Sequence, residues 1–245
     1  NSTVDGVRAV ELFYRPIKNT DSGRVTFLQS QTRLNSPAMG TLMPADYLPV
    51  AQLSDRCVSI FKLAFVQLLQ ALGKFHEREV DIDWASVFVP ARFLRQTEAP
   101  RVVADYCDKF GVKYERVCFE LSPDVLDEAD STAADNVALM RRQGFHFLLT
   151  GFGTEGFKML KTAEFKVDNI MLDGSVAQVL GKSERYDTCV NSLLNFVFDL
   201  NAEVIADGIT NDKHVKQLSG MQCLYYSGEN AGKYIAERYV RNRNE

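Results

Sequence analysis

Short apolar stretches alternate along this chain with longer stretches in which apolar residues recur every three or four positions. The short stretches are rich in β-branched and aromatic residues and favour strands, whereas the longer ones are typical of amphipathic helices. The pattern predicts seven strands, at residues 10–14, 85–89, 117–121, 145–149, 167–172, 203–206 and 223–226. It predicts helices at residues 46–72 (two helices), 102–110, 133–143, 157–161, 186–200, 212–218 and 231–241.

The alternation of strand and helix indicates an α/β fold with a parallel sheet. No linker or change of composition divides the 245 residues, so we predict a single domain over residues 1–245. Seven strand–helix units fit either a barrel that lacks one strand or an open doubly wound sheet. In a barrel, functional side chains lie where the strands end, at their C-terminal face. The residues at or near those ends are Glu11, Arg15, Phe88, Glu120, Thr150, Gly151, Asp173 and Asp207.

Composition narrows the classes of function. The net charge is −4 and the basic residues form no cluster, which argues against a nucleic-acid polymer as partner. None of the five cysteines forms a C-x-x-C pair, and the three histidines lie far apart in the sequence. We therefore expect a reduced, cytoplasmic domain without a zinc site or another cofactor.

The most apolar helical stretch, near residues 57–72, contains Lys62, Gln67 and Gln70. These polar residues shorten its apolar run below the length that spans a bilayer. We expect no membrane contact by this domain itself, and the cytoplasmic part of a larger, membrane-anchored protein fits the same observation.

One glycine motif points to a different function. Residues 151–156 read G-F-G-T-E-G and match the G-x-G-x-x-G fingerprint of dinucleotide-binding oxidoreductases, with Asp168 and Asp173 about 20 residues beyond. However, too little chain follows the motif to complete a dinucleotide fold, the preceding strand carries bulky aromatic residues, and the following helix is short. We therefore rank this function below those that follow.

Six segments can be compared, in order, with known motifs. They are E-L-F-Y-R at 11–15 (similar to E-A-L-L-R), P-A-D-Y-L-P-V-A-Q at 44–52 (P-x-x-F-I-x-x-A-E), F-E-L-S-P at 119–123 (L-E-I-T-E), L-T-G-F-G-T at 149–154 (L-D-D-F-G-T), V-D-N-I-M-L-D-G-S at 167–175 (V-D-x-L-K-I-D-x-S) and V-I-A-D-G-I-T at 204–210 (V-V-A-E-G-V-E). With this set the chain resembles EAL domains, the family of cyclic di-GMP phosphodiesterases. The resemblance implies a TIM-like (β/α)8 barrel. The family's first strand, which bears Q-P, is expected before residue 1 and so to be missing from this chain.

The resemblance also assigns roles to several acids and one arginine. Active members hold metal ions with carboxylates and an Asn, because a metal pair neutralises the phosphodiester and activates water. Glu11 and Glu120 match metal-ligand Glu residues, and Arg15 matches an Arg that contacts the ligand phosphate. Asp173 matches the Asp of K-I-D, and Asp207 replaces the Glu of A-E-G. These five residues form the ligand site that we predict.

Other family positions have lost their functional groups. Phe88 stands for the ligand Asn, Thr150 and Gly151 replace both aspartates of D-D-F-G, and Met171 replaces the Lys beside the catalytic water. Pro123 and Thr210 replace two further acids. The family's Q-G-Y signature near the last strand is not intact here, and Gln222 is the candidate for its Gln. We therefore predict a domain that binds no metal and does not hydrolyse its ligand.

Each surviving residue also has a purely structural interpretation. Glu11 and Arg15 could form a buried ion pair with Glu120 or Asp173, because a mouth without metals needs cations to balance its acids. Asp173 could cap the helix that follows it. Asp207 could serve the turn before Gly208, and Phe88 and Met171 could be core residues.

The sequence thus leaves two main functions open. The first is a receptor for cyclic di-GMP, whose phosphate can be held by Arg and backbone N–H groups without a metal. The second is a scaffold that holds a protein partner or an attached signalling domain and no longer binds the nucleotide. A residual enzyme ranks last, and a homodimer is expected by resemblance alone.

Overall fold

Eight strands form a closed barrel in the computed structural model, which describes residues 3–4, 7–126 and 131–242. β3 is hydrogen-bonded to both β4 and β11, and this double pairing closes the sheet. The barrel strands are β3 (Val10–Asn19), β4 (Val25–Ser36), β6 (Trp84–Phe88), β7 (Val117–Leu121), β8 (His146–Phe152), β9 (Asn169–Leu172), β10 (Glu203–Ala206) and β11 (Tyr225–Tyr226). The strands β4 and β6 to β11 run parallel, whereas β3 is antiparallel to both of its neighbours.

The expectation that the first barrel strand is missing was wrong. β3 is that strand, and a hairpin connects it directly to β4, which the apolar pattern did not predict. β3 carries Arg15-Pro16 where the family has Q-P. Pro16 is tolerated because β12 pairs with β3 at Phe13 and Tyr14, and β11 pairs at Lys18 and Asn19, so residues 15–17 have no strand partner on that side.

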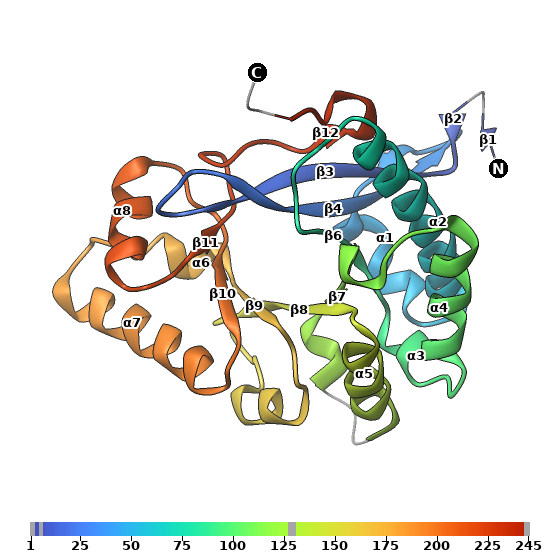
Figure 1. Cartoon of the computed structure of the whole chain (residues 1–245). Helices are drawn as coiled ribbons and strands as arrows, with labels where there is room; N and C mark the ends of the chain where they lie inside the picture. Colours follow the sequence, from blue (N-terminus) through green and yellow to red (C-terminus); the bar gives the residue numbers. More distant parts are fainter. Residues whose placement is uncertain (1–2, 5–6, 127–130, 243–245) are drawn as a thin grey trace.

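Helices cover the outside of the barrel in the order expected of an α/β barrel (Figure 1). They are α1 (Pro44–Ala51), α2 (Arg56–Glu77), α3 (Ala91–Leu94), α4 (Ala99–Phe110), α5 (Ser131–Gln143), α6 (Gly174–Ala177), α7 (Glu184–Asp199) and α8 (Asp212–Gly220). Four 3-10 turns, η1 (Tyr114–Arg116), η2 (Pro123–Leu126), η3 (Met159–Glu164) and η4 (Glu237–Tyr239), and the short strands β1 (Thr3–Val4), β2 (Val7–Arg8), β5 (Gly40–Leu42) and β12 (Ile235–Ala236) complete the described elements.

Residues 231–242 contain no α-helix, although we predicted one at residues 231–241. β12 pairs with β3, and the C-terminal segment runs along the outside of the barrel beside the β3–β4 hairpin (Figure 1). Glu237 accepts bonds from Lys74 of α2 and from Arg78, which directly follows that helix, and this fixes the segment. No helix lies between β3 and β4, so the C-terminal segment takes the place of a covering helix there.

Two apolar layers hold the barrel together. Between strands and helices, aromatic side chains dominate, and Phe119 lies within ring contact of Phe61, Phe65, Phe145 and Phe147. Inside the barrel, each of the eight strands contributes one side chain to a second cluster. Its members are Ile17, Phe27, Trp84, Cys118, Leu148, Met171, Ile205 and Tyr225.

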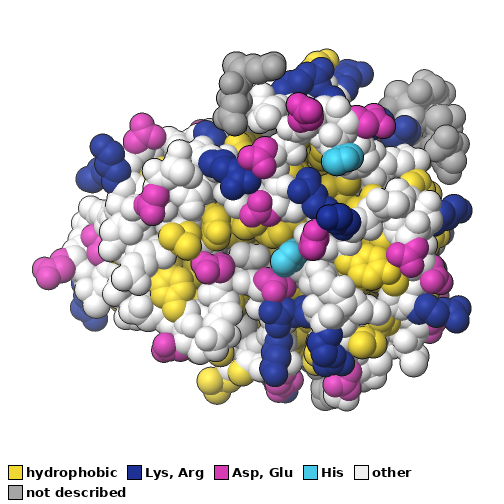
Figure 2. Space-filling model, viewed as in Figure 1, with side chains coloured by type: hydrophobic (Ala, Val, Ile, Leu, Met, Phe, Trp, Pro, Cys, Tyr) yellow, Lys and Arg dark blue, Asp and Glu magenta, His cyan; other side chains and the backbone are white. Residues whose placement is uncertain are grey.

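α2 is the one helix in the described part of the chain whose length and composition would allow it to cross a membrane. Half of its most apolar window is buried inside the protein, and a continuous face packs on the barrel. Core helices of soluble proteins pass the same test, so this property does not change the assignment of α2 to the outer layer of the barrel. On the face shown in Figure 2, acidic and basic side chains are interspersed.

Candidate ligand site at the mouth of the barrel

A polar layer lies directly above the apolar cluster inside the barrel. Strand side chains alternate between the two faces, so residues two positions nearer the mouth also point inward. On β3, which runs the opposite way, that residue is Arg15, and on β4 and β7 the residues are Gln29 and Glu120. Asp207 follows β10.

These side chains form one hydrogen-bonded network centred on Arg15. Its Nε and Nη2 donate to Gln29 Oε1 at 2.8 and 2.6 Å, and Nη2 also donates to Asp207 Oδ2 at 2.9 Å. Gln29 Nε2 donates to Glu120 Oε2 at 3.0 Å, and Ser86 Oγ donates to the same oxygen at 3.2 Å. The Arg15 guanidinium is thus linked to two carboxylates, to Asp207 directly and to Glu120 through the amide of Gln29.

Burial and this network shift the pKa values of Glu120 and Asp207 in opposite directions. Burial raises the pKa of Glu120, and the bonds from Gln29 and Ser86 and the charge of Arg15 offset only part of that rise. Burial would also raise the pKa of Asp207, but the charge and hydrogen bond of Arg15, with bonds from Ser227 and the Gly208 N–H, hold that pKa below its usual value. Asp207 therefore keeps its negative charge to a lower pH than Glu120 does.

The raised pKa of Glu120 leads to a pH-dependent prediction. A carboxyl whose folded pKa exceeds its unfolded value of about 4.3 stabilises the fold below that pH and loses this contribution as the pH rises through the folded pKa. Glu120→Gln does not titrate, so its melting temperature minus that of the wild type is expected to increase from about pH 4 to about pH 8. Thermal unfolding across this range checks the expectation, and a constant difference would contradict it.

The structure changes which residues correspond to the E-A-L-L-R signature. In the family this signature follows the first strand, and here the strand that follows β3 is β4. The segment Q-S-Q-T-R at residues 29–33 therefore occupies the place of the signature, with Gln29 for its Glu and Arg33 for its Arg. The earlier correspondence with residues 11–15 was wrong, because those residues belong to β3.

Glu11 does not join the polar network. It lies on β3 opposite Arg33, its carboxylate accepts a bond from Asn35, and it lines a pocket between β3, α2 and β12. Asp173 caps α6 by accepting a bond from the Ser175 N–H, as its structural interpretation predicted. Of the five predicted site residues, the structure brings Arg15, Glu120 and Asp207 together.

The positions without functional groups serve packing. Thr150 donates to the Leu121 carbonyl, and Met171 belongs to the cluster inside the barrel. Gly151 has φ +74°, and a Cβ there would lie 2.8 Å from Pro123 Cγ. Pro123 and Gly151 therefore fit each other, and an aspartate at position 151 would require at least one of the two segments to move.

The residues at the mouth do not fit the metal ions that the family implies. Within the described residues there is no group of three or more Asp, Glu, His and Cys side chains that could hold an ion. The two carboxylates that do lie here, Glu120 and Asp207, share the cation of Arg15. A divalent ion bound by these carboxylates would lie beside the positively charged guanidinium of Arg15, and the two cations would repel each other.

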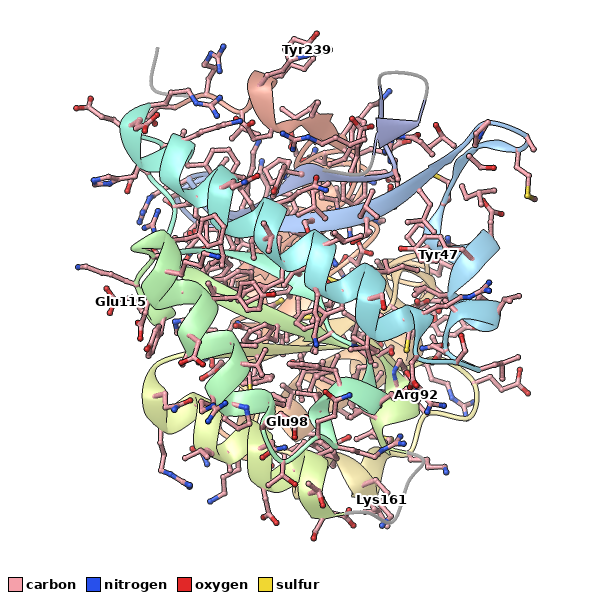
Figure 3. The ribbon with its side chains drawn as sticks, turned by 90° about the vertical axis from the view of Figure 1, so that its right-hand side faces the viewer. Tyr47, Arg92, Glu98, Glu115, Lys161 and Tyr239 are labelled. Atoms are coloured by element: carbon pink, nitrogen blue, oxygen red, sulfur yellow. The ribbon has the colours of Figure 1, made fainter. Side chains whose placement is uncertain are left out.

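Two pockets open at the mouth on either side of Tyr234. One, of about 370 Å³, is lined by Arg15 and Asp207 together with the loops after β10 and β11. The other, of about 220 Å³, is lined by Phe88, Glu120 and residues of β4 and α1, including Tyr47. The Arg15 guanidinium lies 5.0 Å from the centre of the Tyr234 ring. Figure 3 shows Tyr47 beside β4, where its hydroxyl donates to the Thr32 carbonyl at 3.1 Å.

Sequence reasoning missed four residues of this site. Gln29 and Arg33 lie on the unpredicted strand β4, and Tyr234 lies in a segment predicted to be helical. Ser227 follows β11 and donates to Asp207, and it takes the position that was expected for Gln222. Gln222 itself lies in the turn before β11, with φ +62°. The turn-forming N-T-D-S-G at residues 19–23, followed by β-branched and aromatic residues, is the signal that could have revealed β4.

The fold and the mouth together define an α/β barrel with an antiparallel first strand and an acidic, arginine-bridged candidate site. The model of the EAL domain family matches residues 7–234, so the chain belongs to the EAL family. The glycine motif at residues 151–156 does not begin a dinucleotide-binding helix, since the 3-10 turn η3 follows it.

The chain is also similar to known proteins in sequence and in fold. The chain is 24% identical over 229 residues to an uncharacterized signaling protein of Caulobacter vibrioides, covering 90% of this chain and 27% of that protein. It is 24% identical over 202 residues to the cyclic di-GMP phosphodiesterase PdeR of Escherichia coli, covering 82% and 30%. The structure of the EAL enzyme Bd1971 bound to cAMP and cyclic di-GMP superposes with a TM-score of 0.82 at 20% identity, covering 94% of this chain and 63% of that one. The chain spans less than a third of these two sequence relatives.

Proposed function

We propose that this chain is a non-catalytic EAL domain that binds cyclic di-GMP without a metal ion. The observation that carries the binding part is the state of Arg33 at the mouth. Its guanidinium lies 3.8 Å from the centre of the Phe13 ring and donates to Gln31, and within the described residues no ion pair joins it to a carboxylate. Gln31 lines the pocket that also contains Phe88 and Glu120. Arg33 thus offers a held cation, without an ion-pair partner among the described residues, beside a pocket, which suits a phosphodiester.

The non-catalytic part rests on the groups around that pocket. Phe88, Thr150, Gly151 and Met171 supply no amide, carboxylate or amine at the positions where the resemblance implies these groups. Arg15 is occupied by Gln29 and Asp207, so it serves the network and leaves Arg33 as the phosphate contact. Phosphate recognition by an arginine needs no metal, whereas hydrolysis by the family's mechanism does.

Calorimetric titration with cyclic di-GMP, once with EDTA and once with magnesium, tests the proposal. We expect micromolar or tighter binding that is equal in both conditions. Arg33→Ala should weaken it at least about tenfold, because a charge-assisted hydrogen bond contributes about 1.5–3 kcal/mol. Arg142→Ala, which removes an exposed cation at the end of α5, is the matched control and should bind as the wild type does.

Two results would overturn this proposal. Release of linear dinucleotide in the presence of magnesium or manganese would contradict the non-catalytic part. Absence of heat in both titrations would contradict the receptor and leave a second candidate, a protein-binding domain.

A further inference from the structure

The polar layer of the barrel has an arrangement that the loss of metal ligands alone does not require. A site that merely lost its ions would retain acids facing one another, and their repulsion would favour loss of those acids as well. Here Glu120 and Asp207 remain, and a guanidinium links them. We infer that Arg15 is a built-in cation that replaces a bound divalent ion and closes a metal site that the remaining acids could otherwise form. The inference refines the non-catalytic part of the proposed function.

The geometry around Arg15 supports this role. Its side chain is 14% exposed, and the Tyr234 ring lies against the guanidinium. The position is fixed by β3, because Arg15 itself pairs with Gln29 of β4 and the two preceding residues pair with β12. The guanidinium therefore has little freedom to leave the acids, unlike a cation on an exposed side chain.

Gln29 completes the arrangement. Its amide accepts two bonds from Arg15 on one side and donates to Glu120 on the other. A glutamate at this position would accept from Arg15 but could not donate to Glu120, and it would add a third negative charge to the layer. The neutral amide at position 29 and the cation at position 15 are thus complementary, which explains why the two occur together.

The inference predicts that removal of the cation uncovers a metal site. Arg15→Met keeps an unbranched side chain against Tyr234 but leaves Glu120 and Asp207 without their common cation. Manganese is expected to raise the melting temperature of this variant by about 5 °C at saturation, while it leaves that of the wild type unchanged. Arg15→Met/Gln29→Glu should respond at lower manganese concentrations, since a third carboxylate increases affinity for hard cations.

The control removes one of the acids from the same background. Arg15→Met/Asp207→Asn should lose the response to manganese. Arg15→Gln serves as a second variant if Arg15→Met does not fold, and binding of manganese counted by electron paramagnetic resonance on the folded protein gives an independent readout. An equal response of wild type and both Arg15 variants, or no response in any folded variant, would overturn the inference. Neither readout involves cyclic di-GMP, so failure here is distinct from failure of the nucleotide titration.

Discussion

Arg15→Ala is expected to lower the free energy of unfolding by about 3 kcal/mol, near the lower end of the cost of breaking a buried ion pair. The cost arises mainly from the acids that stay behind. Asp207 is 27% exposed and keeps bonds from Ser227 and Gly208, but it loses the charge that lowers its pKa. Gln29 at the same time loses the donor that orients its amide toward Glu120. Urea unfolding at neutral pH measures this change.

A double-mutant cycle separates the ion pair from other effects of truncation. Asp207→Asn alone should cost less than Arg15→Ala, because the amide still accepts bonds and Arg15 still reaches Gln29. The two changes together should cost less than their sum by about 1–2 kcal/mol, which is typical for residues in one network. If the free-energy costs of the two substitutions simply add, Arg15 and Asp207 do not stabilise each other, although they lie within hydrogen-bond distance.

Most of the parallel part of the barrel was predictable from the sequence. β6 to β10 are short apolar stretches, each followed by a helix or a turn, and their periodicity differs clearly from that of α2, α5 and α7. The hairpin of β3 and β4 escaped because β4 mixes apolar with polar inward-facing residues such as Gln29 and Gln31. A strand that lines a polar mouth lacks the uniform apolar pattern of a buried parallel strand.

The same omission misplaced part of the site. The match of residues 11–15 to the signature implied that the first strand was missing, and it gave Glu11 a role for which its position on β3 is unsuited. Arg15, Glu120 and Asp207 were found because they lie near the ends of predicted strands, where any α/β barrel gathers its chemistry. That Arg15 pairs with Asp207 could not be predicted, because this contact depends on the direction of β3 across the barrel.

Gly208→Ala is expected to destabilise the fold by about 3 kcal/mol and to disturb the mouth. Gly208 has φ +75°, and a Cβ there would lie 2.8 Å from the Cα of Gly174, at the start of α6. Part of the cost is the strain of a left-handed residue, about 1 kcal/mol. The rest comes from separating two backbone segments that follow β9 and β10, which are rigid and cannot yield as a side chain does.

Gly156→Ala is the matched control for this substitution. Its φ of +78° is nearly the same, but no atom lies within 4 Å of the added Cβ, so only the strain of about 1 kcal/mol is expected. The difference between the two variants in urea unfolding therefore measures the close approach of the two segments. Because Asp207 precedes Gly208 and accepts its N–H, that difference should be accompanied by weaker binding of cyclic di-GMP in Gly208→Ala alone. If both variants lose the same stability and bind equally, the close contact at Gly208 does not position the mouth.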